Sequence, residues 1–338
     1  MEKLVSTWYK DKSLPENYIF PPEKRPGKFS VPSCDAIPVV DLSKALDHNR
    51  SDIIEQILKA GKEFGFFQVI NHGVPEKLID DTKNVFQEFF EMPAEDKASF
   101  YSEDPGKSSR LCTSSINYHR EEIHYWRDNL RHFCHPLEEY IQHWPTKPDR
   151  YREVVGAYTI EVKKLGSVIL ELISEGLGLD SGYFRGKLSE GILLSVNYYP
   201  PCPDPSLTLG IAKHCDPNII TILLQDVSGL QIFKDGEWIA VEPLPNSFVI
   251  NFGYALQIIS NDKLKSADHR AVTNSNNARM SAALFINPTG DSIIEPAKAL
   301  TDAENPPIYK AFQCKEFLMN YFSMDYRESV LELYKRQA

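Results

Sequence analysis

The chain has 338 residues, which is enough for one large domain or two smaller ones, and its formal net charge of −10 argues against nucleic acid as a partner. It contains no run of about 18 apolar residues, and its first residues lack the apolar core of a signal peptide, so we expect neither a membrane span nor a secretory leader. The six cysteines are scattered and make no C-x-x-C pair, which indicates free thiols in a reducing compartment, most simply the cytosol.

The first half of the chain is expected to be mainly helical. Residues 1–35 are rich in Pro, Lys and Glu and are expected to lie extended over the surface. Hydrophobic periodicity then predicts, in chain order, a strand over 36–42, a helix over 50–65, a strand over 66–73 and a helix over 75–92. Residues 99–148 are expected to form a long loop region with short elements. A long helix is predicted over 149–179, ending near Gly176.

From Ile192 onward, short β-rich runs alternate with turn residues. The predicted strands fall within 193–199, 218–226, 230–241, 247–253, 269–274 and 279–287. Asp235–Gly236 is a hairpin signal inside the third run. This density of strands is typical of a double-sheet jelly roll or a small barrel, and residues 308–333 predict a return to helix.

A candidate metal site begins at His214 and Asp216, two residues apart in "GIAKHCDPNIITILLQD". On a strand both side chains would share one face, with Cys215 on the other. They would supply two ligands of a 2-His-1-carboxylate triad, the usual host of non-haem Fe(II). Because H-x-D is common by chance, an ordinary polar start to a strand is the competing interpretation. The β region offers one further histidine, His269.

Arg279 and Ser281 also stand two residues apart, ten residues after His269. An arginine that points into an apolar barrel is costly unless it meets an anion, and a guanidinium suits a carboxylate. The order of H-x-D, a distant His and then R-x-S is far more specific than any one of these pieces.

With these motifs the chain resembles the plant 2-oxoglutarate- and Fe(II)-dependent dioxygenases over nearly its whole length. The resemblance rests on "IPVVDL", "FGFFQVINHGV", "NYYPPCP", "HCD", His269 and "RMS". The segments "HYWRD", "FCHPLEEY" and "IEPAKAL" are most similar to the branch with hyoscyamine 6-hydroxylase, salicylate hydroxylases and related flavonoid-acting enzymes. The family implies a mainly β fold with helical flanks: an N-terminal α/β region (1–185), a double-stranded β-helix or jelly-roll core (186–296) and C-terminal helices (297–338).

The resemblance also implies the roles of individual residues. His214, Asp216 and His269 would ligate Fe(II), and Arg279 and Ser281 would bind the distal carboxylate of 2-oxoglutarate. The co-substrate would also contact Tyr199 and Asn197. O2 would be the second co-substrate, ascorbate would support activity, and the chain would act as a monomer on a small molecule.

The implied reaction is hydroxylation of an alkaloid, phenolic or flavonoid, with formation of succinate and CO2. Epoxidation, desaturation and O-demethylation are alternatives with the same chemistry. A catalytically silent small-molecule binder and a cupin-like metal protein without 2-oxoglutarate are alternatives of other classes. The intact triad argues against the first, and Arg279 with Ser281 argues against the second.

Candidates for the substrate pocket are Lys213, Tyr254, Phe285, Trp126 and Tyr101. Phe285 is in phase with Ser281 on one strand. Lys213 replaces the small or apolar residue that relatives usually carry, and Tyr254 lies in "GYAL" where relatives often have Gly-Asp-x-Leu. Lys213 faces the pocket only if a bulge turns it inward, and otherwise it faces solvent.

Most of the remaining histidines are expected to have no catalytic role. His72 is interpreted as structural. The loop and surface histidines of the aromatic-rich segment, any one of which could line the pocket, are His119, His124, His132, His135 and His143.

Overall fold

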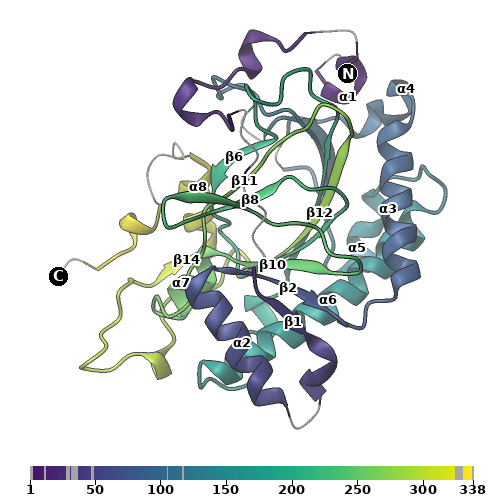
Figure 1. The fold of residues 1–338 in the computed structure, drawn as a ribbon. Coiled ribbons are helices and arrows are strands. Elements are labelled where there is room, and N and C mark those ends of the chain that lie inside the picture. The colour runs from purple at the N-terminus through teal and green to yellow at the C-terminus, as the bar shows by residue number, and fades with distance from the viewer. Residues whose placement is uncertain are drawn as a thin grey trace.

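The computed structural model describes residues 3–10, 13–27, 31, 37–46, 49–104, 106–115, 118–323 and 330–336. Within these residues the core consists of an eight-stranded sheet and a four-stranded sheet that pack against each other (Figure 1). The larger sheet has the order β1 (Val39–Asp41), β2 (Phe66–Ile70), β10 (Phe248–Phe252), β7 (Ile220–Gln225), β12 (Arg279–Asn287), β5 (Gly191–Tyr199), β4 (Asp128–Phe133), β3 (Ser109–Thr113). The smaller sheet has the order β6 (Ile211–His214), β11 (His269–Ala271), β8 (Leu230–Lys234), β9 (Glu237–Ala240). Together they form the mainly β core with helical flanks that the sequence predicts.

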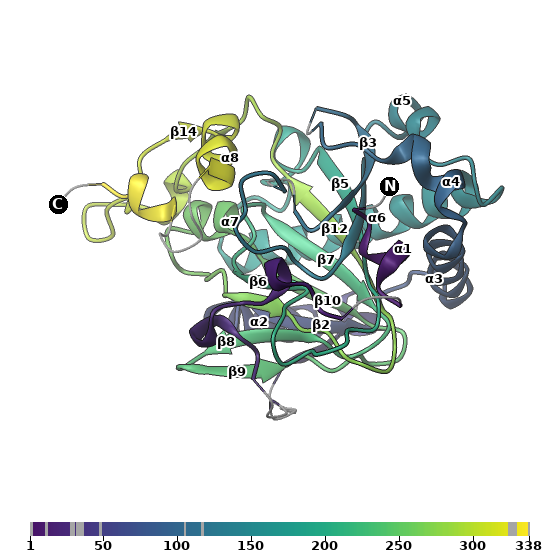
Figure 2. The same ribbon diagram turned by 90° about the horizontal axis from the view of Figure 1, so that it is seen from above.

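The long helices cover one face of the larger sheet (Figures 1 and 2). They are α2 (Arg50–Glu63), α3 (Glu76–Glu91) and α6 (Tyr151–Gly176). Helix α6 packs on β7 and β12 at Gly166, where a Cβ atom would lie 2.2 Å from Ile286 Cδ1. The shorter helices are α1 (Val5–Trp8), α4 (Ala94–Lys97), α5 (Leu137–Tyr140), α7 (Tyr254–Ile259) and α8 (Cys314–Ser323).

Alternation along the strands gives the larger sheet two different faces. Leu194 and Leu284 are fully buried toward the helices and belong to the main hydrophobic core. Ser195 and Asn197 on β5 point the other way and line a cavity with Ser281 of β12. The helical face therefore stabilises the sheet, while the opposite face is free to carry chemistry.

The predicted helices at 50–65, 75–92 and 149–179 are confirmed as α2, α3 and α6. The predicted hairpin is also confirmed, because β8 and β9 pair on either side of Asp235 (φ 52°) and Gly236 (φ 89°). In the tail, α8 is followed by a 3-10 turn, Val330–Leu333, and strands β13 (Ile293–Ile294) and β14 (Phe312–Gln313) form a small sheet of their own.

Two sequence-based expectations need correction. Residues 99–148 contain short elements as expected, but two of these are strands, β3 and β4, which extend the larger sheet beyond β5. The N-terminal segment does not simply lie over the surface, because Val5 and Tyr18 are buried beside Trp126. The many aromatic residues of 99–148 hid the period-two alternation that is typical of strands. In the N-terminal segment, apolar residues are too sparse to indicate that Val5 and Tyr18 are buried.

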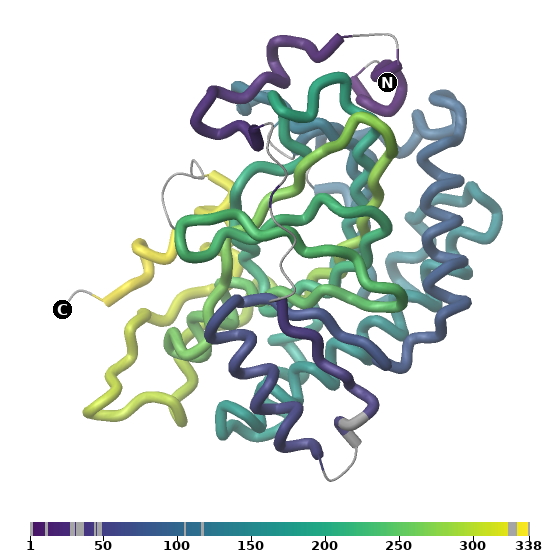
Figure 3. The backbone as a smooth tube through the Cα atoms, viewed as in Figure 1, coloured from purple at the N-terminus to yellow at the C-terminus, as the bar shows by residue number. Residues whose placement is uncertain are grey.

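Figure 3 shows the purple N-terminal segment above the sheets and the yellow C-terminal segment to one side of them. Strands β1 to β4 of the predicted N-terminal region join the same sheet as the core strands, so that region and the core share one continuous sheet. The five described cysteines are buried free thiols, and Cys34 lies outside the described residues. Among the described helices, none has the length and apolar composition needed to cross a membrane.

Candidate active site

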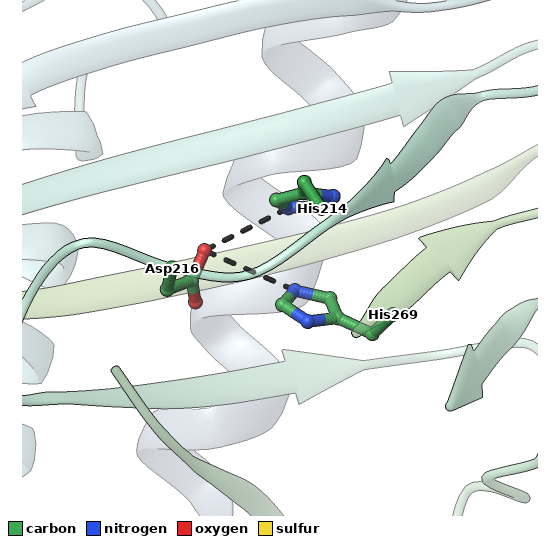
Figure 4. A group of neighbouring side chains, drawn as sticks. All are labelled: His214, Asp216 and His269. Carbon is green, nitrogen blue, oxygen red and sulfur yellow. Dashed lines mark ion pairs between the residues drawn. The ribbon is translucent and has the colours of Figure 1, made fainter. Parts of the chain in front are cut away.

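His214, Asp216 and His269 point toward one another from neighbouring parts of the chain (Figure 4). One ligand atom of each lies within 4.8 Å of the others. The Nε2 atoms of His214 and His269 are 3.7 and 3.8 Å from Asp216 Oδ1. The two histidines are Cα partners on the antiparallel strands β6 and β11, which explains how a residue 55 positions away supplies the third ligand. Asp216 follows the end of β6 rather than continuing it.

Backbone carbonyls hold both imidazoles in one orientation. His214 Nδ1 donates to Ala212 O at 2.9 Å, and His269 Nδ1 donates to Ala267 O at 3.1 Å. This arrangement leaves Nε2 of each ring as the lone-pair donor, as a metal ligand requires. Burial, and then the neighbouring His269, lowers the pKa of His214 to about 4, so the ring is neutral near pH 7.

The carboxylate of Asp216 is also held in place. Its Oδ2 accepts hydrogen bonds from Thr221 Oγ1 at 2.6 Å and Asn251 Nδ2 at 2.7 Å. Burial acts to raise the pKa of Asp216, but the two histidines and these two donors outweigh it and lower the pKa. Asp216 is therefore ionised, with Oδ1 turned toward the histidines. Two imidazoles and one carboxylate, with Nε2 of each ring turned toward Asp216 Oδ1, fit the donor set of a non-haem Fe(II) centre.

Arg279 lies in the same cavity at the start of β12 and is only 2% exposed. Its Nε donates to Val227 O and its Nη2 to Gln225 Oε1, both at 3.0 Å, and its guanidinium lies 5.1 Å from the centre of the Tyr199 ring. These two bonds use two of its five N–H donors. The guanidinium of Arg279 is therefore held in one orientation, and its other N–H groups can donate to an anion.

Strand register brings the other expected co-substrate residues beside Arg279. Tyr199 is the Cα partner of Arg279, and Asn197 is the partner of Ser281. Asn197 Oδ1 accepts from Arg127 Nη1 at 2.8 Å and Asn129 Nδ2 at 2.9 Å, so its own NH2 group is left to donate. All four expected residues line the cavity together with the triad.

The cavity has a volume of about 540 Å³, within the range of sites for small molecules. Leu318, Tyr321 and Phe322 of α8 close one side of it. Tyr321 Oη donates to Cys215 O at 2.7 Å, which ties α8 to the residue between two triad members. A metal, a dicarboxylate and an organic substrate can share such a space.

Comparison with known proteins agrees with this geometry. Residues 192–288 match the 2OG-Fe(II) oxygenase superfamily, and residues 37–147 match the N-terminal region described as non-haem dioxygenase in morphine synthesis. The protein DOWNY MILDEW RESISTANCE 6 of Arabidopsis thaliana is 47% identical over 95% of each chain.

The chain belongs to the 2OG-Fe(II) oxygenase superfamily.

Other members show how completely this oxygenase shares the family's architecture. Hyoscyamine 6-dioxygenase of Hyoscyamus niger is 44% identical over 96% of this chain and 95% of its own. The crystal structure of JOX2 in complex with 2OG, Fe and JA superimposes with a TM-score of 0.87 at 33% identity, covering 99% of this chain and 98% of that one. The protein is therefore a 2-oxoglutarate-dependent dioxygenase, with Fe(II) and 2-oxoglutarate as its cofactor and co-substrate.

Lys213 faces away from the cavity of this oxygenase, so its assignment to the substrate pocket is corrected. Its Nζ lies 2.8 Å from Asp268 Oδ2 and 4.3 Å from the centre of the Phe233 ring, and half of its side chain is exposed. The pairing of β6 with β11 does shift register between Ile211 and His214, but this irregularity leaves Lys213 paired with Asp268 rather than turned toward the metal ligands.

Three aromatic candidates also lie outside the cavity wall formed by the described residues, and these assignments are corrected too. Trp126 is fully buried and donates from Nε1 to Pro200 O at 2.9 Å. Tyr101 donates to Glu103 Oε1 at 2.6 Å, and the Tyr254 ring packs toward Phe317. Phe285 does line the cavity, so its contact with substrate stays a prediction.

The histidines of the aromatic-rich segment are more varied than expected. His132 and His124 are buried rather than on the surface, and His132 Nε2 lies 3.0 Å from Tyr151 Oη. None of the five histidines is among the described residues that line the cavity. His72 is structural as interpreted, since its Nε2 bonds Asn246 O at 3.1 Å.

The sequence-based interpretation missed one group of cavity residues, Arg110, Arg127 and Arg131, which we call the arginine cluster. A signal for it was present, because Arg127, Asn129 and Arg131 follow a period of two, as strand residues on one face do. The expectation of a loop over 99–148 hid that pattern.

Proposed function

We propose that this oxygenase oxidises an unactivated C–H bond of a small specialised metabolite, most simply by hydroxylation. The observation that carries the proposal is the convergence of the triad, Arg279 and Ser281 on one cavity of about 540 Å³, which has room for a substrate beside 2-oxoglutarate. The extra space adjoins the metal ligands, where a substrate must lie to be oxidised.

In this proposal His214, Asp216 and His269 hold Fe(II), while Arg279 and Ser281 hold the distal carboxylate of 2-oxoglutarate. When bound, iron and 2-oxoglutarate supply the oxidising chemistry: one atom of O2 enters the substrate, the other enters succinate, and CO2 leaves. Asn197 and Tyr199 orient the co-substrate from β5.

The protein's own contribution is to position the substrate and to keep water out. Hydrogen bonds orient all three metal ligands before the metal binds. Nδ1 of each histidine bonds a backbone carbonyl, and Asp216 accepts from Thr221 and Asn251, so the side chains need not move to bind Fe(II). Helix α8 covers the cavity with Leu318, Tyr321 and Phe322. Oxidation is therefore confined to a molecule that displaces water from this space.

Alkaloids, phenolics and flavonoids are the proposed substrate classes. Hyoscyamine 6-dioxygenase among the relatives and the JA complex of JOX2 among the similar structures support a small plant metabolite. Epoxidation, desaturation and O-demethylation use the same centre and differ in how the substrate lies.

The test is to add Fe(II) and 2-oxoglutarate without O2 and to record the weak visible charge-transfer band. A metabolite panel is then screened with O2 for substrate-stimulated succinate. Absence of the band in the wild-type protein contradicts the proposed co-substrate site. A band without succinate for any compound favours the silent binder instead.

A further inference from the structure

Arg127 immediately precedes β4, and its guanidinium bridges the end of β3 and the middle of β5. Its Nε donates to Ser114 O at 2.7 Å, and its Nη1 donates to Asn197 Oδ1 at 2.8 Å. Both Arg127 and Asn197 line the cavity, and Asn197 is only 5% exposed. The arginine therefore connects the backbone after β3 to one of the expected co-substrate residues.

The bond to Arg127 fixes which way the carboxamide of Asn197 is turned. A guanidinium can only donate, so the atom that it contacts must be the carboxamide oxygen. Asn129 Nδ2 donates to the same Oδ1 at 2.9 Å, and its own orientation is fixed because it also donates to Val196 O at 3.2 Å. A flipped Asn197 would set its NH2 group against two donors and lose both bonds, one of which is charge-assisted.

The NH2 group of Asn197 is thereby left for a ligand. No hydrogen bond among the described residues involves Asn197 Nδ2, since both of its side-chain bonds are made by Oδ1. The group is not sealed in the interior either, because the fully buried polar side-chain atoms without a partner in the described part of the chain belong to other residues. An N–H donor without an acceptor is costly to bury. The amide therefore opens on the cavity that Asn197 lines.

The register of the strands places Asn197 between Arg279 and the metal ligands. Arg279 lies at the start of β12, and Ser281, the Cα partner of Asn197, is two residues further along. Four residues beyond Ser281, β12 pairs with Thr221 of β7, which donates to Asp216. A donor at this level is suited to the part of 2-oxoglutarate that lies between its distal carboxylate and the metal.

The guanidinium of Arg127 also lies within electrostatic reach of the metal site. Burial lowers the pKa of His214 most, the neighbouring His269 adds to this, and the positive charge of Arg127 contributes a smaller part. A charge so placed could act on an anionic ligand through its field alone, without Asn197. An experiment on Arg127 must therefore separate its field from its bond to Asn197.

The backbone at both ends of this bond is held by other contacts. Ser114 N donates to Arg127 O at 2.9 Å, which ties Arg127 to the end of β3. Asn197 is held by the strands on both sides of β5, where it pairs with Asn129 and Ser281. The side-chain bond therefore fixes little besides the orientation of the carboxamide.

We propose that Arg127 is a positioning residue for 2-oxoglutarate that acts through Asn197. Together with Asn129, it holds the carboxamide so that the NH2 group can donate to the bound co-substrate. Asn197 makes the contact, and the two donors behind it set its direction. This inference rests on the proposed function and adds Arg127 and Asn129 to the co-substrate site.

The test is a double-mutant cycle between Arg127 and Asn197, measured as the affinity for 2-oxoglutarate. Calorimetry on protein loaded with Mn(II) reports binding without turnover. Asn197→Ala removes the donor and should weaken binding roughly tenfold, the loss expected for a hydrogen bond to a charged group. Arg127→Met lets the carboxamide rotate and should weaken binding about threefold or more. In the Asn197→Ala protein, the same Arg127→Met change should weaken binding by less than about twofold.

Two controls separate positioning from charge, and urea unfolding checks that each variant is folded. Arg127→Lys keeps the charge and a donor, so it should recover part of the affinity lost in Arg127→Met when Asn197 is present, and none in the Asn197→Ala protein. Arg110 lies on the same cavity wall, but no hydrogen bond of the described residues joins it to Asn197. Arg110→Met should therefore change the affinity by the same factor with and without Asn197.

An unchanged affinity in Arg127→Met overturns the inference. Equal losses with and without Asn197 also overturn it, because the arginine then acts by its charge, by direct contact or through the fold. Unchanged affinity in Asn197→Ala overturns it as well and assigns the carboxamide to another ligand. None of these results affects the proposed oxygenase function, which the charge-transfer band and succinate formation test separately. Conversely, a coupled Arg127–Asn197 pair in a protein that never forms succinate supports the inference and contradicts the proposed function.

Discussion

Replacing Arg279 with Leu should sharply raise the concentration of 2-oxoglutarate that the oxygenase requires. The guanidinium is 2% exposed and fixed by Val227 O and Gln225 Oε1, so its remaining donors are pre-oriented for a carboxylate. A charge-assisted pair of this kind contributes about 1.5–3 kcal/mol, or roughly a 10- to 150-fold change in affinity. Anaerobic titration of the Fe(II) protein with 2-oxoglutarate, followed by the charge-transfer band, measures that change directly.

Two further variants separate the loss of charge from the loss of folding. Arg279→Lys keeps a cation but loses the planar fork, so its affinity should fall between the wild type and Leu. Gly229→Ala keeps the arginine in the sequence, but the added Cβ would lie 2.7 Å from Arg279 Cδ and 2.9 Å from Val272 O, so it should displace the guanidinium and weaken 2-oxoglutarate binding. Urea unfolding of each variant checks that the protein is folded. An unchanged affinity in a folded Arg279→Leu protein would refute the reasoning and assign the distal carboxylate to another residue.

Alanine at His214, Asp216 or His269 should abolish turnover in a protein that still unfolds cooperatively, because each supplies one of three fixed ligands; full activity of any variant with added iron contradicts the triad. Lys213→Ala should change the free energy of unfolding by at most about 1 kcal/mol and leave the kcat/KM ratio between an acid and an amine unchanged, since the pair with Asp268 is half-exposed. A shift of that ratio toward the amine would place Lys213 at the substrate after all. Burial lowers the pKa of His132 from 6.5 to about 3, so between these values the unfolded state binds a proton that the folded state does not, and stability falls as pH falls, by up to about 1.4 kcal/mol per pH unit. His132→Gln should flatten the dependence of the unfolding free energy on pH between 6 and 4; an identical slope in variant and wild type rules out this contribution.

The sequence by itself determined the elements with strong local periodicity and the chemistry of the centre. Helices α2, α3 and α6 follow from apolar residues at helical spacing, and the β8–β9 turn follows from Asp235–Gly236. His214 with Asp216, and Arg279 with Ser281, could be singled out because two-residue spacing places side chains on one face of a strand. These inferences needed only neighbours along the chain.

Only the tertiary structure decided which distant strands pair. That pairing in turn determines which side chains line the cavity. Arg110 and Arg131 face each other because β3 joins β4 in a particular register, and no local pattern specifies that partner. Pairing of β6 with β11 likewise sets His269 opposite His214. The sequence allows the Lys213 side chain to point to either side of β6. In the structure it points outward, because Asp268 and Phe233 lie on that side and contact its ammonium. Register and burial arise from contacts between remote segments, so the sequence could reveal the metal chemistry but not the charged side chains that line the cavity wall.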